Sequence, residues 1–521
     1  MAGDSLTGAA PIEAAERDSL LAMLGTSPVG LCVSGGADSM ALMHLVAGWQ
    51  AAGRPGVARA AAGAPQPVVV LTVDHGLRAE AAGEARFVAE TATALGFEAR
   101  ILRASGPAPA TGVQAWARDE RRRLVLAALA DAREAAGGVV REDGETGFVA
   151  VMAHHLGDQA ETVLMRLARG SGIDGLSGMR AIDHLAAPAT PERPFGVRAL
   201  LMRPLLGVPR ERLVATLSAR GLMWIEDPSN TDRRFERVRV REALGALREA
   251  GVGVEAIGLS ARRLGQARAA LDSLLRRKLD ELADWHGGMM GTLPLDVLAD
   301  VAGAYGGVRV VAHLLAAFGG TARGPELAEI EALWSELMSG RRRAATLGGC
   351  HVEVVFDGEA AGDRERATTD GHGAVPAGAG RTLRVFREMR DGTLPSSVLA
   401  PGGMVAWDGG RFTLTADRGL AAAVDIAPLG AEGWRVLVRE VPGLEFAGVP
   451  RAAPAGLPAA LSGLPAAWRS GRLVAVPWLA ARLADCEAEA RAAYFGALGP
   501  EAGSVAATFT GLHKIPPLTG R

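Results

Sequence analysis

The chain has 521 residues, of which 49% are hydrophobic and 22% charged, and its formal net charge at pH 7 is −2. This composition is typical of a water-soluble globular protein with roughly two to four domains. The near-zero net charge excludes a protein that binds nucleic acid through its overall charge, so any such contact must come from local basic patches. Charged residues interrupt every apolar run, and the first 20 residues lack a basic-then-apolar pattern. These features argue against a membrane span and a secretory signal, so we expect a cytoplasmic protein with no membrane contact.

The three cysteines, Cys32, Cys350 and Cys486, lie far apart in the sequence. Without a CxxC pair, neither a zinc ribbon nor an iron–sulfur site is indicated, and few scattered thiols fit a reducing compartment. Lysine occurs only at Lys278 and Lys514. A Walker A loop needs a Gly-Lys-Ser/Thr sequence, so this class of nucleotide-binding loop is excluded.

The first 240 residues alternate segments that favour strands with segments that favour helices. Apolar, β-branched runs predict strands at 29–33, 68–74, 98–102 and 148–153. Helical spacing of apolar residues predicts helices at 40–46, 79–95, 113–135 and 158–167. This alternation is typical of an α/β domain with an open parallel sheet that carries helices on both faces.

The alternation of strand and helix patterns ends at about residue 240. Residues 254–285 and 325–338 have helical patterns, and the Ala-, Gly- and Pro-rich segments 51–67 and 186–196 read as flexible insertions. We therefore predict four parts: an N-terminal catalytic domain (1–243), a mainly helical middle domain (244–357), a linker (358–381) and a small α+β C-terminal domain (382–521).

The most specific signal for chemistry is a glycine-rich hexapeptide directly after the first strand, at the start of a helix. It consists of Ser34, Gly35, Gly36, Ala37, Asp38 and Ser39. The glycines allow the backbone to approach a phosphate closely, and the N–H groups of the helix start favour an anion. Asp38 could hold a magnesium ion that bridges phosphates. The alternative is a plain strand-to-helix turn.

Three further segments place polar residues where the other elements begin or end. His75 and Arg78 follow the second strand, and His154, Asp158 and Glu161 follow the fourth. The third segment, 224–241, is rich in arginine, and we single out Arg237 and Arg241 from it. Each segment alone also fits a structural role, such as a solvated helix start or a solvated helix face. Their convergence on the ligand-binding edge of one parallel sheet favours a functional site.

The hexapeptide resembles the SGGxDS signature of the PP-loop ATP pyrophosphatases, which adenylate their substrates and release pyrophosphate. The three further segments are similar, in the same order, to the tRNA(Ile)-lysidine synthetase family. The resemblance is strongest over residues 25–245. It implies a five-stranded, Rossmann-like parallel sheet in the N-terminal domain. It also implies ligation of L-lysine to carbon 2 of the wobble cytidine in the CAU-anticodon isoleucine tRNA, with ATP and Mg²⁺.

The same resemblance implies roles for individual residues. Residues 34–39 would bind ATP, with Asp38 also on the metal; Asp38, Asp158, Glu161 and Arg78 would be catalytic; and His75, His154, Arg237 and Arg241 would contact substrate. The C-terminal domain would provide a further tRNA contact, and a homodimer is left open.

Two positions depart from the family pattern: Gly157 replaces an Asp, and Val238 replaces an Asn. Two alternatives therefore stay open, another PP-loop tRNA-modifying enzyme such as a thiolase, and a catalytically inactive tRNA-binding homologue. Thiolase chemistry generally needs paired cysteines, which this chain lacks.

Overall fold

A computed structural model gives the arrangement of the chain, which forms two compact units. The first unit comprises Met1–Pro188 and Gly196–Ala270, and the second is mainly Leu271–Thr519. The structure describes residues 8–57, 67–77, 80–106, 108–109, 111–138, 140, 144–187, 193, 196–226, 236–285, 290–319, 324–356, 380–389, 394–409, 411–440, 463–477, 494, 498 and 503–509.

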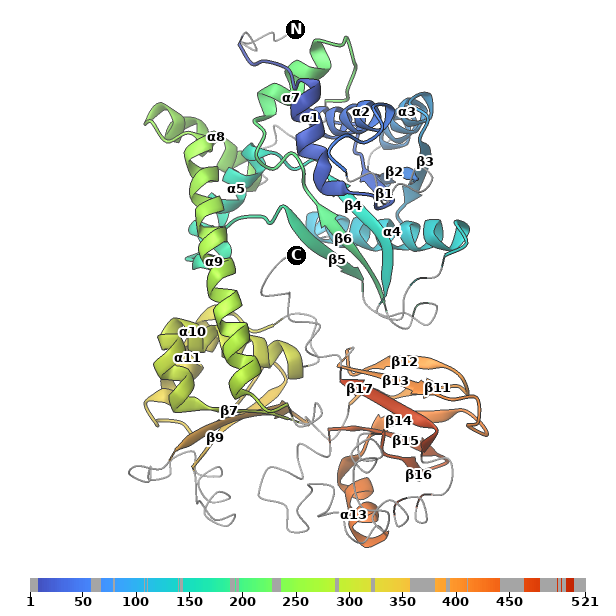
Figure 1. The fold of residues 1–521 in the computed structure, drawn as a ribbon, viewed down its shortest axis with the longest axis vertical. Helices are drawn as coiled ribbons and strands as arrows, with labels where there is room; N and C mark the ends of the chain where they lie inside the picture. The colour runs from blue at the N-terminus through green and yellow to red at the C-terminus, as the bar shows by residue number, and fades with distance from the viewer. Residues whose placement is uncertain are drawn as a thin grey trace. The chain divides into compact units, whose positions relative to one another are not determined.

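A six-stranded sheet with the order β3-β2-β1-β4-β6-β5 forms the centre of the first unit (Figure 1). Its strands are β1 (Val29–Cys32), β2 (Val68–Asp74), β3 (Glu98–Arg103), β4 (Glu145–Met152), β5 (Ile182–Ala187) and β6 (Val197–Met202). Five of them, β3, β2, β1, β4 and β6, run parallel, which confirms the predicted α/β sheet. The sixth, β5, pairs antiparallel to β6 at the edge and was not predicted. Only one of its six residues is buried, so its sequence carries no apolar run.

Helices cover both faces of this sheet (Figure 1). The helices that begin in the first unit are α1 (Ala14–Leu21), the short η1 (Ala22–Leu24), α2 (Ala37–Ala51), α3 (Ala81–Ala94), α4 (Val113–Ala135), α5 (Leu156–Leu167), α6 (Ile173–Leu176), α7 (Arg210–Ser218), α8 (Glu236–Glu249) and α9 (Val254–Leu282). Of these, α1, α2, α3 and α7 share one apolar core with the sheet, and α4 packs in a second core on the opposite face. Successive residues of β2 divide between the two cores, Val68 and Val70 facing one and Val69 and Leu71 the other. That division explains why β2 reads as a continuous apolar run.

Two segments differ from the predicted outline. Helix α2 extends through Ala51, so the expected insertion begins later than residue 51, and residues 58–66 lie outside the described part of the chain. The second expected insertion, 186–196, begins inside β5, and most of its remaining residues also lie outside the described part. The long helix expected at 254–285 is confirmed as α9, three residues shorter at its end.

The second unit begins within α9 and contains helices packed on a small antiparallel sheet. Its elements up to residue 387 are β7 (Met290–Pro294), α10 (Leu295–Phe318), α11 (Leu327–Met338), β8 (Ala344–Leu347), β9 (Cys350–Phe356) and β10 (Arg381–Arg387). The sheet has the order β7-β10-β9-β8. The expected linker at 358–381 lies outside the described residues except at its end, where Arg381 begins β10 and pairs with Phe356 of β9. A strand from beyond that segment therefore completes the sheet of the middle region.

The rest of the second unit is rich in β-structure. Its described elements are β11 (Ser397–Leu399), β12 (Met404–Trp407), β13 (Phe412–Ala416), β14 (Val424–Pro428), α13 (Gly430–Glu440), β15 (Pro465–Arg469), β16 (Arg472–Ala475) and β17 (Val505–Phe509). They form a four-stranded sheet, β11-β14-β15-β16, and a three-stranded sheet, β12-β13-β17, around one apolar core. This arrangement agrees with the α+β character expected for the C-terminal part.

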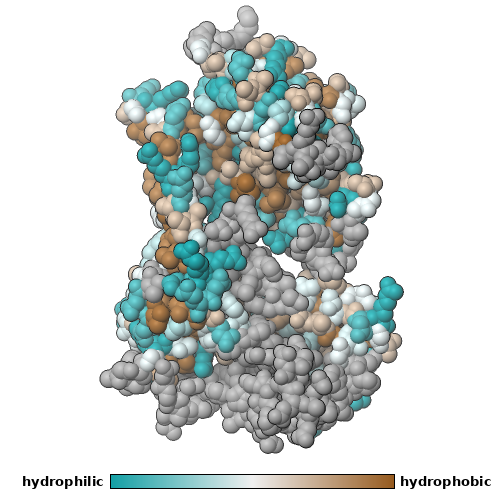
Figure 2. Space-filling model, in the orientation of Figure 1, coloured by the Kyte–Doolittle hydropathy of each residue, from teal (hydrophilic) through white to brown (hydrophobic). Residues whose placement is uncertain are grey.

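The surface mixes hydrophilic and hydrophobic side chains on the face shown in Figure 2. The first unit exposes some large apolar residues, such as Leu167 and Met223, which is normal for folded domains. No helix among the described residues is both long enough and apolar enough to cross a membrane.

Gly30 in the central strand β1 gives the first test of this packing. A Cβ atom at Gly30 would lie 2.4 Å from Leu129 Cδ2 of α4, so the helix approaches the sheet only because residue 30 has no side chain. We expect Gly30→Ala to lower the free energy of unfolding of the first unit by about 1–3 kcal/mol, because the core becomes overpacked. The measurement is the first thermal or urea unfolding transition of the full chain.

Gly245 provides the matched control for that substitution. It lies on the exposed side of α8, and a Cβ atom there would meet nothing within 4 Å. Gly245→Ala should leave stability unchanged or raise it by up to about 1 kcal/mol. Equal effects of the two substitutions would contradict the packing described for β1 and α4.

Candidate active site

The candidate site lies at the carboxyl ends of β1 and β4, which are neighbours at the centre of the sheet. Residues Cys32 and Met152 pair at these ends. The chain moves outward from β1 through β2 to β3, then returns to the other side of β1 with β4. Such a reversal of strand order opens a crevice where α/β sheets bind ligands.

The hexapeptide after β1 forms a tight loop that leads into α2. Gly35 has φ +89°, a conformation that favours glycine, and Gly36 is the N-cap residue of α2. The Ser39 hydroxyl donates a hydrogen bond to the Gly36 carbonyl oxygen (3.0 Å) and accepts one from the Ser34 amide (3.2 Å). No side chain of the described residues caps α2, so the N–H groups at its start are available to an anion.

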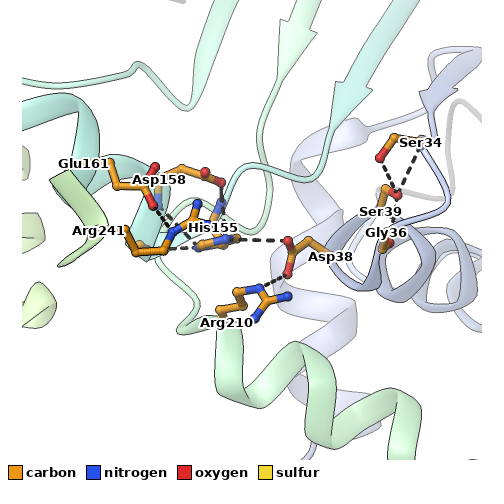
Figure 3. Close-up of polar contacts among 10 residues, drawn as sticks. Ser34, Gly36, Asp38, Ser39, His155, Asp158, Glu161, Arg210 and Arg241 are labelled. Carbon is orange, nitrogen blue, oxygen red and sulfur yellow. Dashed lines mark hydrogen bonds and ion pairs between the residues drawn. The ribbon is translucent and has the colours of Figure 1, made fainter. Parts of the chain in front are cut away.

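Asp38, in the first turn of α2, faces groups from two other elements (Figure 3). Its Oδ1 lies 3.3 Å from Arg210 Nε at the start of α7, and its Oδ2 lies 3.7 Å from His155 Nε2. Within the described part of the chain Oδ1 accepts no hydrogen bond, although it is buried. A carboxylate oxygen in this state fits Mg²⁺, which prefers oxygen ligands and commonly takes one or two carboxylates together with phosphates.

The segment after β4 begins with a helix cap made by histidine. His155 is the N-cap residue of α5, and its Nδ1 accepts a hydrogen bond from the Gly157 amide (3.0 Å). In return, the backbone N–H of His155 donates to Asp158 Oδ2 (3.1 Å), which completes a capping box. The cap fixes the positions of both the imidazole and the Asp158 carboxylate.

Glu161 lies one turn further along α5 and is almost fully buried, with 2% of its side chain exposed. Its Oε1 accepts a hydrogen bond from Arg241 Nε of α8 at 2.7 Å. Its second oxygen, Oε2, is also buried and has no partner among the described residues. Partial burial alone would lower the pKa of Arg241, but the hydrogen bond and charge of Glu161, with Asp158 and Asp38, raise it overall. A buried carboxylate oxygen without a hydrogen-bond partner favours a nearby cation.

His154 has a different environment from its neighbour. Its Nδ1 accepts a hydrogen bond from Arg203 Nε (3.2 Å), and Arg203 is itself held by the Arg180 carbonyl oxygen. Burial, chiefly, and the positive charge of Arg203 lower the pKa of His154 to about 4, against the opposing effect of Asp158. His154 is therefore a neutral imidazole near pH 7.

The three remaining predicted site residues are His75, Arg237 and Arg78. His75, at the end of β2, lies beside Trp116 with 6.1 Å between ring centroids, and burial is the main cause that lowers its pKa. Arg237 lies on the exposed side of α8, close enough to lower the pKa of His154. Arg78 lies outside the described residues.

Comparison with known proteins places this arrangement in a family. Residues 12–247 match the family described as the PP-loop domain. The tRNA(Ile)-lysidine synthase of Ruegeria pomeroyi is 31% identical over 456 residues, which are 86% of this chain and 88% of that protein. The chain belongs to the tRNA(Ile)-lysidine synthase family.

Two further members of the tRNA(Ile)-lysidine synthase family are more similar over shorter stretches. The protein from Methylobacterium nodulans is 40% identical over 63% of this chain and 87% of its own length. The protein from Bradyrhizobium diazoefficiens is 39% identical over 55% of this chain and 74% of its own length. Among solved structures, the U34-tRNA thiolase NcsA from Methanococcus maripaludis aligns with a TM-score of 0.35 and 15% identity, too low to bear on function.

The described cysteines fit a tRNA(Ile)-lysidine synthase better than a thiolase. Burial raises the pKa of Cys32, at the end of β1, to about 12, and that of Cys350, in β9, also to about 12. A thiol with so high a pKa stays protonated near pH 7 and is a poor nucleophile. Neither described cysteine is therefore suited to sulfur transfer.

Sequence reasoning missed three residues of this site. Arg210 begins α7 and Arg203 directly follows β6. Only the packing of these elements beside the loop brings Arg210 to Asp38 and Arg203 to His154. His155 is next to His154 in the sequence, and no local pattern decides which of the two imidazoles faces the carboxylates. The capping box of α5 is the feature that decides it.

His154 supplies the test of the electrostatics. We expect its imidazole to titrate with a midpoint of about 4, well below the ordinary value of 6.5, in an NMR titration of the folded chain. Because the unfolded state takes up this proton below about pH 6.5 and the folded state only near pH 4, His154 destabilises the fold as pH falls through that range.

The same titration can be repeated on the Arg237→Gln variant, which keeps the hydrogen bond from Arg203 to His154. Removal of one neighbouring positive charge should raise the His154 midpoint toward its ordinary value. A midpoint above 6 in the unaltered chain would contradict the description of His154 as buried beside cations.

Proposed function

We propose that this chain ligates L-lysine to carbon 2 of the wobble cytidine in a CAU-anticodon isoleucine tRNA, in two steps at one site. As a member of its family it is an ATP-dependent ligase that modifies tRNA. The observation that carries the fuller proposal is the convergence of Asp38 with Asp158 and Glu161 at the β1 and β4 ends of one sheet (Figure 3). The three substrates of the reaction, ATP, free lysine and tRNA, are in the cytoplasm, where we place the enzyme.

The first step would take place over the loop after β1. The N–H groups at the start of α2 and the Ser34 and Ser39 hydroxyls would hold the phosphates of ATP. Asp38 would hold Mg²⁺, which when bound neutralises phosphate charge. The cytosine oxygen at carbon 2 attacks the α-phosphorus of ATP, and pyrophosphate leaves. Arg210 is half-exposed beside Asp38, and its guanidinium would stabilise the negative charge of the leaving pyrophosphate.

The second step would use the carboxylates of α5. Asp158 and the open Oε2 of Glu161 would bind amino groups of lysine, because a buried carboxylate oxygen without a partner favours a cation. The ε-amine, once neutral, attacks carbon 2 of the adenylated cytidine, AMP leaves, and the proton released passes to a carboxylate or to water. Arg241 would hold Glu161 in place through the hydrogen bond from Nε to Oε1.

Contacts with tRNA would come from the basic side of the site. Arg237 is exposed on α8 near His154, and neutral His154 and His75 can hydrogen-bond a base or ribose without adding charge. We expect the C-terminal region, residues 382–521, to provide a second contact with the tRNA.

The experiment that tests this function measures AMP and pyrophosphate release with each reactant omitted in turn. We expect release with ATP, Mg²⁺, lysine and a transcript of CAU-anticodon isoleucine tRNA, and none when that transcript carries uridine at the wobble position. Release that is independent of tRNA would contradict the proposal. A chain that binds this tRNA but releases no AMP would support the inactive homologue instead.

Asp38→Ala tests the role assigned to the loop. We expect loss of AMP formation with an unchanged unfolding midpoint, because metal-assisted charge neutralisation contributes several kcal/mol to such steps. The control is Asp119→Ala, since 73% of the Asp119 side chain is exposed on α4 and its pairing with Arg122 is long, 3.8 Å. Near-normal turnover in folded Asp38→Ala protein would eliminate the proposed role.

Glu161→Gln separates the two steps. The substitution keeps the shape of the side chain but removes the charge, so the lysine KM should rise and adenylated tRNA should accumulate in a single-turnover assay. Glu236→Gln, on the exposed pair with Arg169, is the matched control. An equal loss in both steps would assign Glu161 a metal or structural role.

A further inference from the structure

His155 occupies the space between the two halves of the proposed site. Its side chain is 5% exposed and comes from the junction of β4 and α5. Nε2 lies 3.4 Å from Asp158 Oδ2 on one side and 3.7 Å from Asp38 Oδ2 on the other (Figure 3). The imidazole is therefore the one group drawn in this view that lies within ion-pair distance of the carboxylates of both α2 and α5.

The helix cap determines which nitrogen faces these carboxylates. Backbone N–H groups can only donate, so the His155 Nδ1 that receives them at the start of α5 must be the unprotonated nitrogen. The ring proton is then on Nε2, the nitrogen that lies 3.4 Å from Asp158 Oδ2 and 3.7 Å from Asp38 Oδ2. One side chain thus fixes the start of α5 with one nitrogen and faces two carboxylates with the other.

The departure from the family pattern at Gly157 leaves room for this ring position. A Cβ atom at Gly157 would lie 2.8 Å from His155 Cε1 and 3.0 Å from Nδ1. The imidazole therefore lies in the space that a side chain at position 157 would need.

We propose that His155 is a positioning residue that orients Asp38 toward MgATP and Asp158 toward lysine, and so couples the two halves of the site. The proposal rests on the function proposed above for these two carboxylates. Groups that orient a ligating carboxylate without touching the substrate typically change metal affinity or activity by about 10–100-fold when they are removed.

Two substitutions separate the cap from the contact with the carboxylates. In His155→Asn, the amide oxygen can replace Nδ1 as the cap acceptor, but the side chain is too short to reach the carboxylates. In His155→Gln, the amide nitrogen can replace Nε2 as the donor, but the cap is weakened. His184→Asn is the control, because His184 is in the edge strand β5 and lies 4.0 Å from Glu145.

The measurements are the unfolding midpoint of the full chain, the Kd of MgATP by calorimetry, and the lysine KM. We expect His155→Asn to keep the midpoint within about 2 °C of the unaltered chain and to raise both the MgATP Kd and the lysine KM roughly tenfold. His155→Gln should lower the midpoint by about 2–4 °C but change both constants less than His155→Asn does.

A purely structural role for His155 predicts the opposite order. In that case His155→Asn would bind MgATP and lysine normally, and His155→Gln would be the poorer in stability and binding, which would overturn the proposal. An increase in only one of the two constants would overturn the coupling. Because the MgATP Kd does not depend on turnover, this test stays distinct from the proposed function, which fails if the unaltered chain makes no lysidine.

Discussion

The parallel pairing of β1 with β4 is the constraint on which the rest of the site depends. These strands are far apart in sequence, yet their carboxyl ends meet with Cys32 opposite Met152. Asp38 and Asp158 each follow these paired residues by six positions, so one register brings both carboxylates to the same crevice. The burial of both strands on two faces, in the cores with α2 and α4, fixes that register.

The site places acidic and basic side chains close together. Three carboxylates, those of Asp38, Asp158 and Glu161, lie close to Arg210, Arg241 and a histidine. Neighbouring carboxylates repel one another, and cations beside them offset that repulsion. In the proposed reaction the substrates bring charges of both signs, a metal and amino groups for the carboxylates and phosphates for the arginines. Exchange of partners between protein and substrates would let the charge balance persist through both steps.

Much of the first unit could be predicted from sequence because its signals are local. The buried strand β2 is a run of β-branched residues, and the loop after β1 contains two consecutive glycines, Gly35 and Gly36. Helix α5 has Asp158 and Glu161 one turn apart. The edge strand β5 could not be predicted, because its single buried residue leaves no pattern. Arg203 and Arg210 could not be assigned either, since contact with His154 and Asp38 depends on where β6 and α7 pack. In the second unit, β10 completes a sheet with β9 across the segment expected to be a linker, and such nonlocal pairing leaves no trace in a local pattern.

We propose that the carboxylates at the carboxyl ends of β1 and β4 serve lysine transfer to an adenylated tRNA. The most direct measurement is mass spectrometry of nucleosides from a CAU-anticodon isoleucine tRNA after incubation with the full chain, MgATP and isotope-labelled lysine. We expect the wobble cytidine to become labelled lysidine, with one AMP formed for each lysidine. An unmodified wobble cytidine, from folded protein that binds both MgATP and this tRNA, would contradict it.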